Sequence, residues 1–278
     1  PDTEYLVSGN LAMAENTTLT VMPGVELYVS DDVTIVIDGD IIALGTTDSR
    51  ITFAAENNYW NGFRLANGAN SYFKYCIVKN IKGTFISNQR ESYTSIEKST
   101  FNDNTASQVF KVLSTTWPTN HDIIYSNFIE NISFSLNNEY NRFTYNNFIN
   151  NFGGASASTG IATGPIKYDT TWTADTDTFG FNNVFSNTFN DIGVQSLSMR
   201  ASNSLDVTIS EENYFGSSNE ETVDEAIIDF FENGSLGIMY VNIATQPSEL
   251  TNGIVWKILV NNKDAQDEYT LMDPVGVG

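Results

Sequence analysis

The chain has 278 residues, 41% of them apolar, which is enough to bury a sizeable core. Its 34 acidic and 13 basic residues give a net charge of −21, a field that repels nucleic acid and anionic membranes. The single cysteine excludes a disulfide within the chain, and no apolar run approaches the roughly 18 residues of a membrane span. This charge is typical of an extracellular or cell-surface protein, and it suits calcium, which takes carboxylate and carbonyl oxygens.

Short apolar runs with period-two alternation fill residues 18 to 55 and are separated by turn pairs such as Pro23-Gly24 and Asp38-Gly39. This alternation predicts strands with one buried face. The alternating residues are Leu19, Val21, Val25, Leu27, Val29, Val33, Ile35, Ile37, Ile51 and Phe53. Cys76 lies in a further apolar run, SYFKYCIVKNI, and is predicted to be a small core residue.

One unit then recurs at residues 95–104, 122–131, 141–150 and 182–191. Each copy has a polar residue two positions before a phenylalanine and an apolar residue five positions before it. The polar residues are Ser99, Ser126, Asn146 and Asn187, the aromatic ones Phe101, Phe128, Phe148 and Phe189, and the apolar ones Ile96, Ile123, Phe143 and Val184. Three copies also place an asparagine three positions after the phenylalanine, namely Asn104, Asn131 and Asn151.

Weaker strands are predicted between these units, at 84–88, 108–114, 133–139, 165–169 and 194–200. Together they give a repeat of roughly 20–30 residues, the range of solenoid architectures. Stacked coils place equivalent residues above one another at about 4.8 Å, so the phenylalanines are predicted to form an internal column. The three asparagines are expected at coil corners, either as ladders bonded between coils or simply as turn residues.

The last part of the chain departs from the repeat. Ser218 and Glu221 have the spacing of a capping box, so one short helix is predicted within 217–234. The β-helix is expected to span residues 1–248. Residues 249–278 are interpreted as a linker and the start of a truncated following module, so the chain is expected to be part of a larger multidomain protein.

Several stretches together carry a family resemblance. YLVSGNLAMAENTTLTVMPGVELYV, IVIDGDIIALGT, ITFAA and WNGFRL resemble the N-terminal coils of secreted bacterial right-handed parallel β-helix surface proteins, within the pectin-lyase-like superfold. ENYFG is similar to the Asn-Tyr-Trp-Gly turn that closes such domains, with Phe in place of Trp. The resemblance covers roughly residues 5–245 and implies an all-β, right-handed parallel β-helix of about eight to ten coils.

The resemblance leaves the activity open, because this fold hosts lyases, glycosidases, adhesins and spacers. Lyases of the superfold use Lys or Arg as a base, often with calcium, and Lys111, Lys167 and Arg200 fall on the weaker strands of three coils. A lysine base needs a lowered pKa, against which a charge of −21 acts. No clear pair of catalytic Asp residues is evident. His121 opens a strand without a second histidine nearby and is expected at the surface.

Binding has more support in the sequence. Residues 167–180 interrupt the repeat, and long coil loops often carry function. The predicted ligand-binding residues are the aromatic side chains of Tyr168, Trp172 and Trp117, and the predicted calcium ligands are Asp169, Asp175 and Asp177. The tryptophans would otherwise be lids folded onto their coils. The prediction is a non-catalytic surface module for adhesion, glycan binding or spacing, with a polysaccharide or another surface protein as partner. The alternative is a calcium-dependent polysaccharide lyase.

Overall fold

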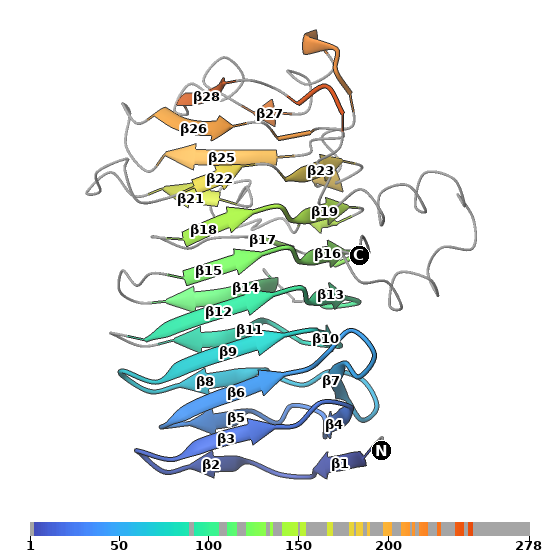
Figure 1. The fold of residues 1–278 in the computed structure, drawn as a ribbon, viewed down its shortest axis with the longest axis vertical. Helices are drawn as coiled ribbons and strands as arrows, with labels where there is room; N and C mark the ends of the chain where they lie inside the picture. The colour runs from blue at the N-terminus through green and yellow to red at the C-terminus, as the bar shows by residue number, and fades with distance from the viewer. Residues whose placement is uncertain are drawn as a thin grey trace.

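The computed structural model is almost entirely parallel β-sheet, wound into a β-solenoid (Figure 1). The residues that the structure describes are 3–88, 92–105, 110–115, 121–131, 134–135, 141–149, 151–153, 166–168, 178–180, 182–185, 188–189, 197–201, 207–211, 213–214, 217–221, 227–228, 237–241 and 244–246. Successive strands enter three sheets in turn, so β1, β4 and β7 are neighbours in one sheet although two strands separate them along the chain. This order confirms the predicted parallel β-helix.

Three long sheets, here named A, B and C, form the walls. Sheet A contains β1 (Thr3–Val7), β4 (Val25–Val29), β7 (Ile51–Ala55), β10 (Cys76–Lys79), β13 (Thr100–Asn102), β16 (Asn127–Ile129), β19 (Asn147–Ile149) and β23 (Asn183–Phe185). Sheet B contains β2 (Leu11–Met13), β5 (Ile35–Ile37), β8 (Phe63–Leu65), β11 (Thr84–Asn88), β14 (Phe110–Thr115) and β17 (Phe134–Ser135). Sheet C contains β3 (Thr18–Val21), β6 (Asp40–Leu44), β9 (Asn70–Lys74), β12 (Tyr93–Glu97), β15 (His121–Ile124), β18 (Asn141–Thr144), β22 (Thr178–Gly180), β26 (Val207–Glu211) and β28 (Gly237–Val241).

Two smaller sheets belong to the later turns. They contain β20 (Phe152–Gly153) with β24 (Thr188–Phe189), and β21 (Ile166–Tyr168), β25 (Leu197–Ala201) and β27 (Ile227–Ile228). The described residues give about five nearly complete turns, from β1 to β15, whereas eight to ten coils were expected. Strands beyond β15 continue sheets A and C, and β17 continues sheet B, with parts of their turns outside the described residues.

The interior is a set of apolar columns in strand register. Leu27 pairs with Phe53, and the same column continues through Val78 to Phe101. It ends with the aromatic residues that the repeat predicted. Phe101 stacks on Phe128 at 5.1 Å between ring centroids, and Phe128 on Phe148 at 4.9 Å. The prediction of an internal phenylalanine stack is therefore confirmed for these three residues.

The predicted register of the fourth copy of the repeat, at residues 182–191, is wrong. Phe148 pairs with Val184, not with Phe189, which pairs with Gly153 instead. Asn182, and not Asn187, continues the polar row of Asn146, whose backbone N–H donates to Asn182 Oδ1 at 2.8 Å. The copy is therefore FGFNNVFSN, which matches FTYNNFINN five positions earlier than the predicted register. The strand pairing of β19 with β23 therefore decides the register, and a valine stands where a phenylalanine was predicted.

Asparagine ladders link the coil corners as predicted. Asn104 Nδ2 donates to Asn131 Oδ1 and Asn131 Nδ2 to Asn151 Oδ1, both at 2.9 Å. The left-handed backbone falls one residue earlier, at Asp103 and Glu130, each with φ of 54°. The asparagines therefore turn inward and satisfy backbone groups that the short corner leaves without strand partners.

A second ladder lies at the corner between sheets C and A. The backbone N–H of Ser99 donates to Ser126 Oγ at 3.2 Å, and that of Ser126 donates to Asn146 Oδ1 at 2.9 Å. Cys76 joins its start, because its N–H donates to Ser99 Oγ at 3.1 Å. Cys76 is fully buried, as predicted, and burial raises the pKa of its thiol to about 12, so it remains a thiol at neutral pH.

The predicted helix within 217–234 is wrong over part of its length. Glu220 and Glu221 are helical, but Ile227 and Ile228 form strand β27 and pair with Leu197 and Ser198 of β25. Ile227 and Ile228 therefore belong to the sheet formed by β21, β25 and β27. Residues 247–278, which include the predicted linker and following module, lie outside the described residues. In the described part of the chain, no helix is long and apolar enough to cross a membrane.

Candidate functional site

Most of the predicted site residues lie outside the described residues: Trp117, Trp172, Asp169, Asp175 and Asp177. Tyr168 ends strand β21, where its backbone is in register with Ala201 of β25, and its side chain is not among those described. The proposed glycan and calcium roles of this inserted coil stay predictions. The coil itself is long, since the ladder residues Asn146 and Asn182 are 36 residues apart, against 20 for Ser126 and Asn146.

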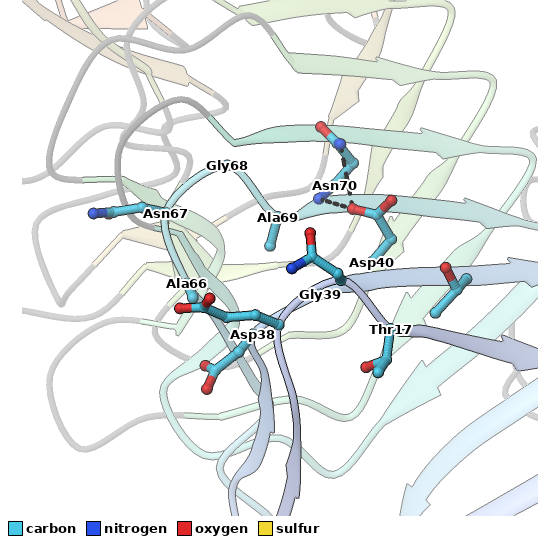
Figure 2. A pocket seen from close by; sticks show the side chains of 12 residues that line it. Thr17, Asp38, Gly39, Asp40, Ala66, Asn67, Gly68, Ala69 and Asn70 are labelled. Atoms are coloured by element: carbon cyan, nitrogen blue, oxygen red, sulfur yellow. Dashed lines mark hydrogen bonds between the residues drawn. The ribbon is translucent and has the colours of Figure 1, made fainter.

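A cleft of about 670 Å³ opens elsewhere, at the corner between sheets B and C of the first three turns (Figure 2). Three corner loops form it, following β2, β5 and β8. Their stacking brings together residues from three separate parts of the sequence. The lining residues are Glu15, Asn16, Thr17, Thr18, Asp38, Gly39, Asp40, Ala66, Asn67, Gly68, Ala69 and Asn70.

Glycine allows these loops to stack closely. A Cβ atom at Gly39 would lie 1.9 Å from the backbone oxygen of Thr17, so no larger residue fits without moving the loop. The Asp40 N–H donates to that same Thr17 oxygen at 2.9 Å, which holds the second loop against the first. The wall of the cleft is therefore fixed by backbone contacts and its opening is lined by polar side chains.

Asp40 and Asn70 form the polar edge of the cleft. Asp40 Oδ1 accepts from the Asn70 backbone N–H at 2.8 Å and from Asn70 Nδ2 at 3.3 Å, as Figure 2 shows. These bonds fix the orientation of both side chains. Among the described residues, no group of three or more His, Cys, Asp or Glu side chains is arranged to hold a metal ion, so Glu15, Asp38 and Asp40 line the cleft without forming such a group.

An aromatic strip continues from this edge across the outer face of sheet C. Tyr72 and Tyr93 have ring centroids 5.8 Å apart, tilted by 52°. Tyr93 is in register with Asn70, so the strip begins in the same row as the cleft edge. Tyr72 is 38% exposed, which leaves part of its ring open to a ligand. We call Tyr72, Tyr93 and Asp122 the sheet C strip.

Asp122 fixes the second ring of the strip. The Tyr93 hydroxyl donates to Asp122 Oδ2 at 2.8 Å. Burial, followed by this hydrogen bond, raises the pKa of Tyr93 to about 12, so the phenol remains neutral over the physiological range. The strip therefore offers two aromatic rings and a carboxylate, on rigid strands rather than on a loop.

The three basic residues considered for lyase chemistry are only partly brought together. Lys167 of β21 is in backbone register with Arg200 of β25, so these two lie on neighbouring strands. Lys111 is in β14 of sheet B, where it pairs with Thr84 and Ser135 instead. Of the three residues that were expected to line one face, only Lys167 and Arg200 are therefore neighbours in backbone register.

His121 is not at the surface, contrary to expectation. It is 1% exposed, and its Nδ1 accepts a hydrogen bond from the Thr94 backbone N–H at 3.0 Å. Burial lowers the pKa of His121 to about 4, and the charge of Asp122 acts in the opposite direction. Since the row inside sheet C continues from His121 to Thr94 and Ser71, whose hydroxyl oxygens are 2.7 Å apart, the imidazole belongs to a buried polar row.

Acidification is expected to destabilise the protein through His121. The unfolded chain takes up a proton near the ordinary pKa of 6.5, whereas the folded chain resists it down to about 4. The stability contribution is complete above pH 6.5, falls as the pH drops through this window, and amounts to about 3 kcal/mol. In the variant His121→Asn, the new side chain can accept the same hydrogen bond through its Oδ1. The free energy of unfolding of this variant should therefore fall by about 3 kcal/mol less between neutral and acid pH than that of the unmutated chain. Urea titrations at several pH values measure it, and parallel curves for the two proteins would contradict the assignment.

No family model, curated protein or solved structure was found to match this chain. The fold is therefore established by the order and register of the strands alone.

The sequence contains a signal for the strip but not for the cleft. Tyr72 follows the turn at Asn67 and Gly68 and lies between the inward residues Ser71 and Phe73, which places it on the outer face. The cleft residues come from loops about 23 to 30 residues apart, whose stacking depends on the register of every intervening strand.

Proposed function

We propose that the chain is a non-catalytic, extracellular or cell-surface module that binds a glycan along the sheet C strip and the adjoining cleft. The observation that carries this proposal is the exposed ring of Tyr72 beside Tyr93, in direct continuation of the cleft edge at Asp40 and Asn70. The strong net negative charge supports an extracellular setting.

The chemistry of a sugar fits this arrangement. One face of a pyranose ring is covered by C–H groups, which pack on an aromatic ring, while its hydroxyls lie around the edge. Carboxylate and amide groups accept and donate hydrogen bonds to neighbouring hydroxyls, and Asp40, Asn70 and Asp122 supply them next to the rings. A β-strand scaffold limits the loss of conformational entropy on binding, which favours recognition by a rigid surface.

The alternative proposal remains a calcium-dependent polysaccharide lyase, favoured by the register of Lys167 beside Arg200. Lysine as the base requires a lowered pKa, for which a neighbouring arginine is one physical cause. Release of unsaturated sugar products by the purified chain would support this alternative over a binding module.

A glycan array probed with and without calcium tests the binding proposal. Tyr72→Ala should weaken retention of the best glycan by roughly tenfold or more, the equivalent of about 1.4 kcal/mol. Tyr59→Ala is the matched control, because Tyr59 is also 38% exposed but lies outside the strip and the cleft.

The outcomes separate the proposals. Equal losses of glycan retention in the Tyr72→Ala and Tyr59→Ala variants would show that the sheet C strip is not the binding site. Retention of no glycan by the unmutated chain would leave a spacer, or an adhesin that contacts protein, as the better description. Glycan retention that requires calcium would indicate a calcium site formed by residues other than the described ones.

A further inference from the structure

Two of the chain's Asn-Gly pairs, Asn61-Gly62 and Asn67-Gly68, lie among the described residues and differ strongly in their surroundings. An asparagine followed by glycine is the sequence most prone to spontaneous loss of its side-chain amide, because glycine leaves its own nitrogen unhindered. Whether the reaction occurs in a folded protein depends on whether the backbone can rotate that nitrogen toward the side chain.

Asn61-Gly62 is restrained by hydrogen bonds and by close packing against the next coil. The Asn61 backbone N–H donates to Val33 O at 2.9 Å, and Asn61 Nδ2 donates to the Asp32 carbonyl oxygen. The Gly62 carbonyl accepts from Ile35 N–H at 3.1 Å, and a Cβ at Gly62 would lie 2.1 Å from Thr84 O. An approach of Gly62 N to the Asn61 side chain would break the Asn61 side-chain hydrogen bond and move the Gly62 backbone, which is packed against the next coil.

Asn67-Gly68 lies in an exposed turn at the corner between sheets B and C. It forms the middle of a turn closed by the Ala69 N–H, which donates to Ala66 O at 3.2 Å. Both residues are exposed, and a Cβ at Gly68 would meet nothing within 4 Å. Figure 2 shows the Asn67 side chain pointing away from the other labelled residues of the cleft. The turn therefore has space in which Gly68 N can approach the side chain.

We propose that Asn67 is a site of spontaneous deamidation that changes the charge of the cleft. The backbone nitrogen of Gly68 attacks Cγ of Asn67, a C–N bond forms, and the Cγ–Nδ2 bond breaks. The proton lost from the Gly68 nitrogen leaves with the amide nitrogen as ammonia. Water then opens the cyclic imide at either carbonyl, which gives aspartate or isoaspartate. The product adds a carboxylate to a cleft that Glu15, Asp38 and Asp40 already line.

The reaction is measured by peptide mapping with mass spectrometry after the folded chain is kept in mildly alkaline buffer. Conversion at Asn67 should be at least roughly tenfold faster than at Asn61, because Gly62 is buried against the next coil whereas Gly68 is exposed and has open space around it. In urea both pairs should convert at similar rates. Asn67→Gln should abolish conversion at this position, since the longer side chain forms the corresponding ring much more slowly.

Equal rates at Asn61 and Asn67 in the folded chain would overturn the proposal. So would an unchanged Asn67 in the folded chain under conditions in which the urea-unfolded chain converts there. The effect on the ligand rests on the proposed function: Asn67→Asp, the product of the reaction, should alter glycan retention on the same array. Failure of the unmutated chain to retain any glycan would refute the proposed function and leave the mass measurement unaffected.

Discussion

Phe128→Ala is expected to destabilise the protein by about 3–5 kcal/mol, the usual cost of truncating a buried phenylalanine. Phe128 is fully buried and lies between Phe101 and Phe148, stacked on both with interplanar angles of 16° and 8°. Removal of the ring leaves a cavity that the two neighbouring coils cannot close without leaving their strand register. Equilibrium unfolding in urea, followed by circular dichroism, measures the loss.

Met22→Ala provides the comparison for this prediction. Met22 is 62% exposed, so its truncation should change the free energy of unfolding by no more than about 0.5 kcal/mol. If Phe128→Ala lowers the free energy of unfolding no more than Met22→Ala does, the phenylalanine column does not contribute to stability as proposed.

Asn131→Asp is expected to cost about 3–5 kcal/mol at neutral pH, although the two side chains have nearly the same shape. Asn131 is fully buried, and its Nδ2 donates to Phe101 O at 3.0 Å and to Asn151 Oδ1 at 2.9 Å. An ionised aspartate would place a negative oxygen against both acceptors. Since burial would raise the pKa of the new carboxyl, the loss relative to the unmutated chain should shrink on acidification.

Asn10→Asp is the matched exchange at an exposed position and should have little effect at either pH. A neutral-pH loss for Asn131→Asp no larger than that of Asn10→Asp would mean that the ladder is only turn chemistry.

The fold was predictable because its signals are local and repeated. Alternation in residues 18–55 specifies strands, and the spacing of Phe101, Phe128 and Phe148 specifies their stacking. The alignment failed at Val184 because the copy with the strongest aromatic match, Phe189, is not the copy that the strand register selects. Similarity of residue type identifies a column, whereas backbone pairing decides which residue enters it.

Burial of single polar residues was harder to predict. His121 accepts a hydrogen bond from the Thr94 backbone N–H, 27 residues away in sequence. Its position resembles that of a surface residue at the start of a strand until the register places it beside Thr94 and Ser71. The same reason hides the cleft, whose lining residues meet only after three turns are stacked.

The corner ladders show that the rise of each coil along the axis does not depend on how many residues the coil contains. Asn104 and Asn131 are 27 residues apart and Asn131 and Asn151 are 20 apart, yet the same 2.9 Å side-chain bond joins each pair. Each circuit therefore advances by one strand spacing, about 4.8 Å, whatever its residue count. Extra residues extend sideways from the solenoid, so loops can lengthen during evolution without changing the spacing of the coils above and below them.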